Sequence, residues 1–368
     1  MASDSTLLRG SFRILFLYDV AEAIDLEKLR SLLGARAGTV EQGFPRRTPE
    51  YVRFEHPPVV EPGECLTVGS AGEVGCPIKY YPFGVVVVQV RVPFECDWNS
   101  LLAQASRWMD TADIEPSVRD MMRKRLEHVI PAVVRLNSEW LQETYLVTEI
   151  HEVLERGSDP LTASELSLKH GEKIVQLVRG EQVPIAPKAI EETLQASLSY
   201  YPWDLVVIGS YSTVVFDRAE DADATAQVLE HAKMQLLEFR YYDKLMTQVL
   251  SDFYGILEQK RNILFSRWSL PRDANRLNTI RLDVMDLSER IDNAIKFVSD
   301  IYYARVYRQA ATRIGVPDYR NLVDQKLRTA GDLYDFTIDQ FNETRSFFLE
   351  VVVAILVALD VILVLKGK

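Results

Sequence analysis

Short apolar runs alternate with turn-forming residues over the first half of the chain. Runs rich in valine, isoleucine and aromatic residues are typical of strands on a half-buried sheet, and they predict strands at 13–20, 51–56, 84–92, 145–149 and 204–216. Apolar residues at helical spacing predict helices at 26–33, 98–110, 116–141, 164–179 and 186–199. Asp97 and Thr162 stand where helix N-caps belong. The pattern therefore predicts an α+β sheet domain over residues 1–217.

Two short segments of this region resemble each other. Residues 80–87 read YYPFGVVV and residues 200–207 read YYPWDLVV, so each is an aromatic-proline entry into an apolar strand. The similarity of the two segments predicts an internal duplication of the sheet domain. Convergent strand-entry chemistry is the alternative interpretation of two copies of eight residues.

From about Ala222 onward the apolar spacing changes to that of long helices. One heptad register runs from Leu229 to Leu264, a second follows Pro271 and runs from 277 to 301, and a third helix starts near 318. The third helix is expected to use Leu322, Leu327, Tyr334, Phe341 and Phe348 for packing. Heptad spacing requires a facing apolar seam, so residues 222–346 are predicted to fold back as an antiparallel, coiled-coil-like helical stalk.

The end of the chain is apolar on every side. Residues 347–365 hold two valine-rich runs interrupted by Asp360 and end at Lys366; as a helix they rise about 28 Å, close to one hydrocarbon core. This predicts a transmembrane helix, with a buried core helix as the alternative. Glu350 lies at one boundary. Asp360 is expected to be protonated, to meet another helix of an oligomer, or to be hydrated near the far boundary.

Net charge limits the partners. The chain carries 42 Lys and Arg against 53 Asp and Glu, which gives a net charge of −11. Specific DNA binding is not expected, because it needs a basic face that replaces counterions. A local exception surrounds the turn between the first two long helices, where basic and aromatic residues suit an RNA or a membrane surface; the alternative is a solvated loop. The candidate partner-binding residues there are Arg261, Arg267, Trp268 and Arg272.

Motifs that carry enzyme chemistry are scarce. The glycines of 69–75 lack the spacing of a nucleotide-binding loop, and His151-Glu152 lacks the second histidine of a zinc protease. Gly209-Ser210-Tyr211-Ser212 follows a strand but is not a G-x-S-x-G elbow. No catalytic residue, cofactor or metal site is therefore predicted.

The C-terminal half resembles a known family. A long helix through Tyr241-Tyr242-Asp243-Lys244-Leu245, a second heptad helix, a third with Arg345, and Leu349-Glu350 opening an apolar run are similar to the Rmd type family "required for meiotic nuclear division", also described as domain of unknown function 155. The resemblance implies a sheet domain, a helical bundle and a C-terminal membrane anchor, without established catalytic residues. The resemblance extends to bacterial and mitochondrial proteins. Because the N-terminus does not read as a transit peptide, a bacterial inner-membrane protein with a cytoplasmic domain is expected, or a mitochondrial inner-membrane protein in a eukaryote.

Three functions follow as expectations. The first is a membrane-anchored, non-enzymatic scaffold or tether that forms homo-oligomers and presents the α+β domain to a protein or ribonucleoprotein partner, linked to translation or membrane organisation. The second is an oligomeric ion channel built on residues 347–365, with Asp360 as its pore acid. The third is an enzyme in the sheet domain, which requires a deep pocket with several convergent titratable groups.

Overall fold

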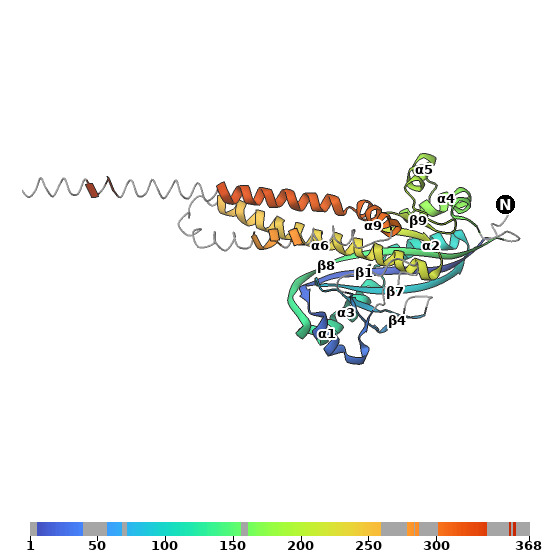
Figure 1. Cartoon of the computed structure of the whole chain (residues 1–368), viewed down its shortest axis with the longest axis horizontal. Helices are drawn as coiled ribbons and strands as arrows, with labels where there is room; N and C mark the ends of the chain where they lie inside the picture. Colours follow the sequence, from blue (N-terminus) through green and yellow to red (C-terminus); the bar gives the residue numbers. More distant parts are fainter. Residues whose placement is uncertain are drawn as a thin grey trace, which may run out of the picture. The chain divides into compact units, whose positions relative to one another are not determined.

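The computed structural model describes residues 6–39, 57–67, 72–155, 161–258, 278–282, 284–286, 301–336, 353–354 and 356–357. Within this part of the chain the fold is mixed α/β (Figure 1), with an eight-stranded sheet of order β2-β3-β6-β7-β1-β8-β10-β9 and a two-stranded sheet β4-β5. The strands are β1 (Leu7–Ile24), β2 (Gly38–Thr39), β3 (Val59–Glu61), β4 (Cys65–Thr67), β5 (Glu73–Gly75), β6 (Ile78–Tyr80), β7 (Val85–Cys96), β8 (Val133–Leu154), β9 (Leu205–Ile208) and β10 (Ser212–Phe216).

Strand β1 lies at the centre of the large sheet. It pairs antiparallel with both β7 and β8, while β10 runs parallel to β8 and antiparallel to β9. Side chains alternate between the two faces of a strand. Phe12, Ile14 and Phe16 of β1 belong to the hydrophobic core on one face, so Ser11 and Arg13 point to the other. The alternation makes one face apolar and leaves charged positions on the opposite one.

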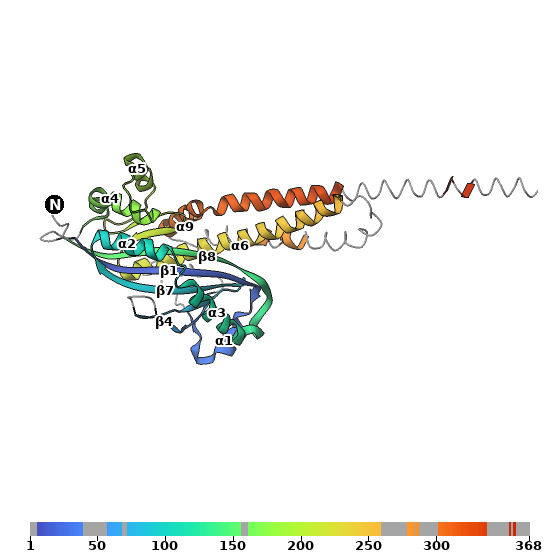
Figure 2. The same ribbon diagram turned by 180° about the vertical axis from the view of Figure 1, so that it is seen from behind.

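The apolar face is covered by helices from the first 180 residues. Large side chains of α2 (Trp98–Met109), α3 (Glu115–Val129) and α4 (Ala163–Arg179) enter the same core cluster as β1. Helix α2 lies against β1, as the view from behind shows (Figure 2). Asp97 and Thr162 cap α2 and α4 by accepting the backbone N–H of Ser100 and Glu165, which confirms both predicted N-caps. The helices are α1 (Leu26–Leu33), α2 (Trp98–Met109), α3 (Glu115–Val129), α4 (Ala163–Arg179) and α5 (Pro187–Gln195), with short 3₁₀ turns η1 (Gly34–Arg36) and η3 (Ile130–Ala132).

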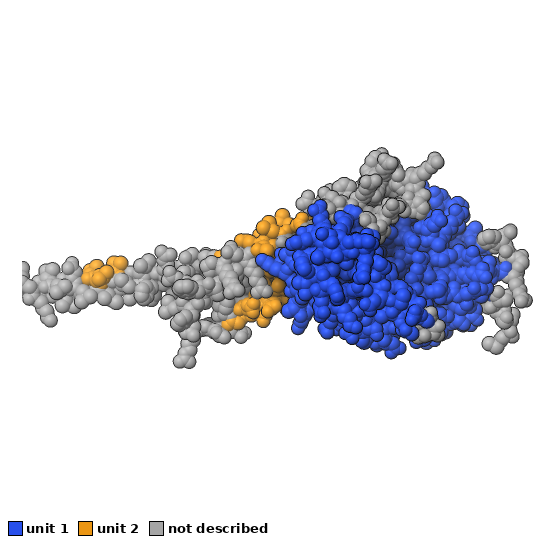
Figure 3. Space-filling view, turned by 90° about the horizontal axis from the view of Figure 1, so that it is seen from below, with its two compact units in different colours: residues 1–241, 290–318 blue, residues 242–289, 319–368 orange. Residues whose placement is uncertain are grey.

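The chain divides into two compact units (Figure 3): residues 1–241 with 290–318, and residues 242–289 with 319–368. The first holds both sheets, the start of the 40-residue helix α6 (Ala219–Glu258) and helix α9 (Ile301–Ile314). The second is helical where it is described. There Lys326 Nζ lies 2.5 Å from Asp243 Oδ1, so this ion pair joins α6 to the helix that continues to residue 336.

Two predicted elements differ from the structure. The helix predicted over 116–141 ends at Val129, and β8 starts at Val133. Pro131 lies between them, and a proline cannot donate the hydrogen bond that would continue the helix. The strand predicted over 204–216 is a hairpin, because Gly209 N–H bonds to Ser212 O at 2.9 Å and turns the chain between β9 and β10. The strand predicted over 51–56 lies outside the described residues.

The predicted fold class, which ended in a transmembrane helix, and the predicted membrane localisation are wrong. None of the helices that the structure describes has the length and apolar character needed to cross a bilayer. Long helix α6 is not a span because charged side chains recur along it, and burying each in hydrocarbon costs several kcal/mol. Of the proposed span 347–365, only residues 353–354 and 356–357 are described. The membrane anchor is withdrawn.

Candidate functional site

Two arginines face each other across the centre of the sheet. The β1–β7 register places Arg13 directly opposite Arg91, on the face away from the hydrophobic core. Like charges in directly opposed positions destabilise a sheet, and Arg13 is 4% exposed, so water screens its charge poorly. This pair therefore requires compensating carboxylates.

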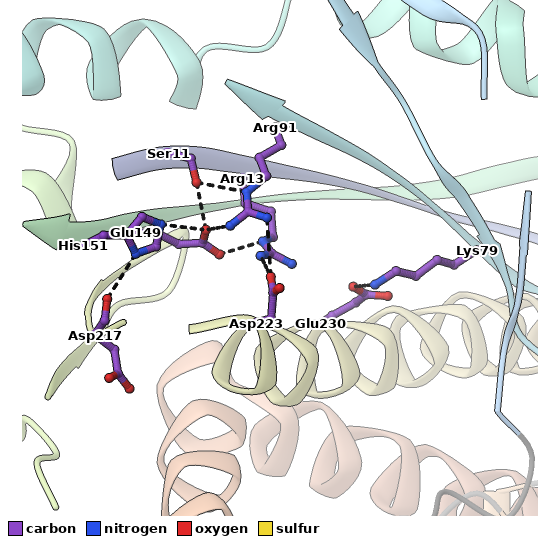
Figure 4. Close-up of polar contacts among 9 residues, drawn as sticks. All are labelled: Ser11, Arg13, Lys79, Arg91, Glu149, His151, Asp217, Asp223 and Glu230. Atoms are coloured by element: carbon purple, nitrogen blue, oxygen red, sulfur yellow. Dashed lines mark hydrogen bonds and ion pairs between the residues drawn. The ribbon is translucent and has the colours of Figure 1, made fainter. Parts of the chain in front are cut away.

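Two carboxylates bridge both arginines. Glu149 of β8, which is fully buried, accepts from Arg13 Nε at 2.7 Å and from Arg91 NH2 at 2.8 Å. Asp223 of α6 pairs with Arg13 and lies 3.6 Å from Arg91 NH1. Figure 4 shows the four side chains converging between the sheet and α6. Two positive and two negative charges make the cluster neutral, and it fastens the start of α6 to the central strands.

Neighbouring polar groups complete this charge cluster. The Ser11 hydroxyl donates to Glu149 Oε2 at 2.8 Å and accepts from Arg91 Nε at 3.1 Å. The His151 ring nitrogen Nε2 lies 3.9 Å from Glu149 Oε2, and its Nδ1 lies 3.1 Å from the carbonyl oxygen of Asp217. Charge-assisted hydrogen bonds of this kind are the strong ones. Glu149 thus has hydrogen-bond donors on both of its oxygens.

A second ionic contact holds the next turns of α6. Glu230 accepts from Lys79 Nζ of β6 at 2.6 Å and from the Tyr81 hydroxyl at 2.6 Å. Lys79 and Glu230 are both buried. Burial, reinforced by the Glu230 charge, raises the pKa of the Tyr81 hydroxyl well above its usual value, so Tyr81 remains a hydrogen-bond donor to Glu230.

A third contact lies further along the same helix. Lys233 Nζ lies 3.1 Å from Glu143 Oε2 of β8, and Arg240 pairs with the same carboxylate. Burial lowers the pKa of the Lys233 ammonium to about 8, and its nitrogen lies 5.1 Å from the centre of the Tyr145 ring, where a cation is stabilised by the ring face.

These contacts follow the period of α6. Asp223 and Glu230 are seven residues apart, as are Lys233 and Arg240, and a spacing of seven brings side chains back to the same side of a helix. The acids meet basic groups of the sheet and the bases meet Glu143. A buried ion pair adds little net stability, but leaving one partner alone is costly. We call this row of contacts the ionic clamp; it defines the register of α6 on the sheet.

Gly10 allows the clamp to assemble. A Cβ atom at position 10 would lie 1.9 Å from the backbone oxygen of Glu149 and 2.8 Å from the Phe94 ring, and the β1–β8 register shifts at Gly10. Gly10→Ala is therefore expected to lower the free energy of unfolding by about 1–3 kcal/mol, as overpacking does, measured by urea denaturation. Gly75→Ala is the control, because nothing lies within 4 Å of its added Cβ; equal effects of the two changes would contradict this close approach.

The site residues predicted from the sequence cannot be compared with the charge cluster. Glu350, Asp360 and the basic tip of Arg261, Arg267, Trp268 and Arg272 all fall outside the described residues. The charge cluster was missed, although a signal exists: Ser11 and Arg13, Gln89 and Arg91, and Glu149 and His151 each occupy alternate positions of a strand. Polar residues two apart in a strand mark one face.

The fold and the clamp together define a class: a mixed α/β domain whose charged sheet face is closed by a long helix. Residues 9–223 match the family described as "Uncharacterized protein MJ0711, N-terminal domain". The match covers more than half of the chain, and the chain belongs to this family. It includes the charge cluster from Ser11 to Asp223, whereas Glu230 and Lys233 lie beyond it.

One relative extends this comparison. The "Uncharacterized protein MJ0711" of Methanocaldococcus jannaschii is 22% identical over 192 residues, which are 52% of this chain and 58% of that protein. The aligned region therefore spans less than two thirds of the relative. No solved structure matches the chain. The resemblance to the family "required for meiotic nuclear division" is wrong: the matching model is a different family, and it covers the N-terminal half rather than the helices on which the resemblance was based.

Proposed function

We propose that this protein is a non-enzymatic scaffold that self-associates through the helices of its second unit. The observation that carries the proposal is a pair of exposed apolar side chains on the helix that is described as far as residue 336. Leu322 is 38% exposed and Phe336 is 56% exposed. They are fourteen residues apart, two heptads, and so share one side of the helix.

The same helix buries a different side. Val323 and Ala330 are fully buried and seven residues apart, so the position that packs within the chain is Val323, the neighbour of Leu322. Leu322 and Phe336, with Thr329 between them at heptad spacing, occupy the positions that a coiled-coil seam uses. A second copy of the chain offers an identical seam, and two-fold association of identical surfaces is the commonest form of oligomer. A homo-oligomer is therefore the partner that we propose.

The ionic clamp supports a structural rather than a catalytic role for the sheet face. Its carboxylates and basic groups are paired with each other, so the chemistry of these groups goes into holding α6. Specific buried ion pairs are best attested as devices that define register. In this proposal the first unit is a rigid body that self-association brings together in more than one copy. In the same proposal, a second partner, either a protein or a ribonucleoprotein, binds the homo-oligomer.

Sedimentation equilibrium of the full chain tests the proposal. We expect a dimer or larger oligomer. The double change Leu322→Glu with Phe336→Glu is expected to weaken association at least about tenfold, because it places two charges in the seam. A tenfold loss of affinity corresponds to only about 1.4 kcal/mol of binding free energy. Leu168→Glu is the matched control, since Leu168 of α4 in the first unit is 88% exposed. A monomeric wild-type chain, or equal association of both variants, would overturn the proposal.

A further inference from the structure

Helix α9 carries a local excess of positive charge in an acidic protein. Its fourteen residues include Arg305, Arg308 and Arg313 and no Asp or Glu, against a net charge of −11 for the chain. All three arginines are exposed. Among the residues that the structure describes, none of the three guanidinium groups forms an ion pair. Such a concentration of positive charge attracts negatively charged ligands.

The arginines surround a hollow. Its volume is about 360 Å³, and it is lined by Ala196, Leu198, Arg305, Arg308, Gln309, Thr312 and Arg313. The lining lies entirely within the first unit, between α9 and the segment that joins α5 to β9. The volume is at the small end of the range of about 300–1,000 Å³ found for sites of small molecules.

Gln309 supplies a second, independent observation. Its amide nitrogen Nε2 is buried and has no hydrogen-bond partner within the described chain. A buried donor without an acceptor costs about 1–3 kcal/mol, so the Gln309 amide calls for an acceptor from outside the chain, such as an ordered water or an ion. An oxygen-rich anion in the hollow neutralises the arginines, and it offers the missing acceptor when the Gln309 side chain turns its covered Nε2 toward the hollow.

The walls of the hollow are held in place. The Ser210 hydroxyl donates to the backbone oxygen of Arg313 at 3.0 Å, and the Tyr307 hydroxyl donates to Gln235 of α6. Leu198 exchanges both backbone hydrogen bonds with Val206 of β9. A site built on fixed elements presents its charges without first ordering them, which favours binding.

Phosphate is the anion that fits this donor set. Guanidinium groups bind phosphate through two parallel N–H···O bonds, and a phosphate group offers several oxygens to several donors. A cation in the last turn of a helix also complements the helix dipole, which accounts for Arg313. It does not account for Arg308 and Arg305, which lie about one and two turns earlier in the helix.

The geometry points to a binding site for a small phosphate-bearing ligand in the hollow between α9 and the α5–β9 segment, with Arg305, Arg308 and Gln309 as its donors. The site is separate from the seam proposed for self-association, so either proposal stands if the other fails.

Isothermal titration calorimetry of the full chain tests the site, with inorganic pyrophosphate and adenosine triphosphate as probes at fixed salt. We expect at least one probe to bind. Arg305→Gln and Arg308→Gln are each expected to weaken binding about tenfold. Each change removes a charge-assisted hydrogen bond, whose loss lowers the affinity tenfold or more. Gln309→Leu is expected to weaken binding without changing the net charge.

The matched control is Arg36→Gln, which removes one exposed positive charge from η1, away from the hollow. Its affinity is expected to stay within twofold of wild type. Since Arg305 and Arg308 are exposed, their variants should keep the wild-type melting temperature, which separates lost binding from lost folding. Binding of neither probe, or equal weakening by Arg36→Gln and Arg308→Gln, would overturn the site.

Discussion

Replacing Glu149 by Gln is expected to cost about 3–5 kcal/mol of the free energy of unfolding, the range for breaking a buried ion pair from one side. Glu149 is fully buried and bonds Arg13 and Arg91. Burial opposes the charge on Arg13, but the carboxylates of Glu149 and Asp223 outweigh it and raise the pKa of the guanidinium. Arg13 therefore stays charged in the variant, opposite Arg91 and with one carboxylate fewer. Urea denaturation followed by circular dichroism measures the loss.

Glu152→Gln is the matched control on the same strand. Glu152 pairs with Arg9 at 3.4 Å, but both side chains are about half exposed, and exposed ion pairs contribute about 0–1 kcal/mol. The double change Arg13→Met with Glu149→Leu is expected to be more stable than Glu149→Gln, since it leaves no uncompensated charge and retains Arg91 beside Asp223. A loss below about 1 kcal/mol for Glu149→Gln would show that the cluster does not hold the sheet face.

The second large effect depends on pH and arises at Asp19 of β1. Asp19 is 5% exposed. Burial raises the pKa of its carboxyl to about 7, although the Asn137 amide, which donates to Asp19 Oδ1 at 3.0 Å, opposes the rise. The unfolded chain ionises this group near its ordinary value of 3.8. Between these values the folded state holds a proton that the unfolded state has lost, so stability falls as pH rises.

Asp19→Asn is expected to remove this loss. Three pKa units correspond to about 4 kcal/mol, so the variant should match wild type near pH 4 and exceed its free energy of unfolding by up to about that amount above pH 7. Urea denaturation from pH 4 to pH 8 measures the difference. Asp113→Asn, at an exposed position of the turn before α3, is the control for the substitution itself, and its effect on the free energy of unfolding is expected to be smaller than that of Asp19→Asn. A pH-independent difference between wild type and Asp19→Asn would contradict the raised pKa.

Several elements could be read from local pattern because local interactions decide them. Helix α1 coincides with the predicted range 26–33, and α2 and α4 begin after the predicted caps. The long helix α6 contains the first part of the heptad register from Leu229. A cap bonds residues three apart, and a heptad repeats within one helix, so neither needs the rest of the fold.

The charge cluster needed information that no local pattern holds. Arg13, Arg91, Glu149 and Asp223 come from four elements separated by tens of residues, and only the strand registers place them together. Alternation along each strand does mark the charged face. It does not show which charges meet, because a shift of one residue in register moves every side chain to the other face.

The sequence by itself determined the local elements of this protein. These are strands within β1, β7 and β8, the capped helices α2 and α4, and the change to long helices near Ala222. Tertiary structure decided that residues 204–216 form a hairpin and that Val323 rather than Leu322 faces inward. The physical reason is the separation along the chain over which each kind of interaction acts. Caps and periodicity act over a few residues, whereas pairing of charges and the choice of buried side depend on partners that only the folded chain brings near.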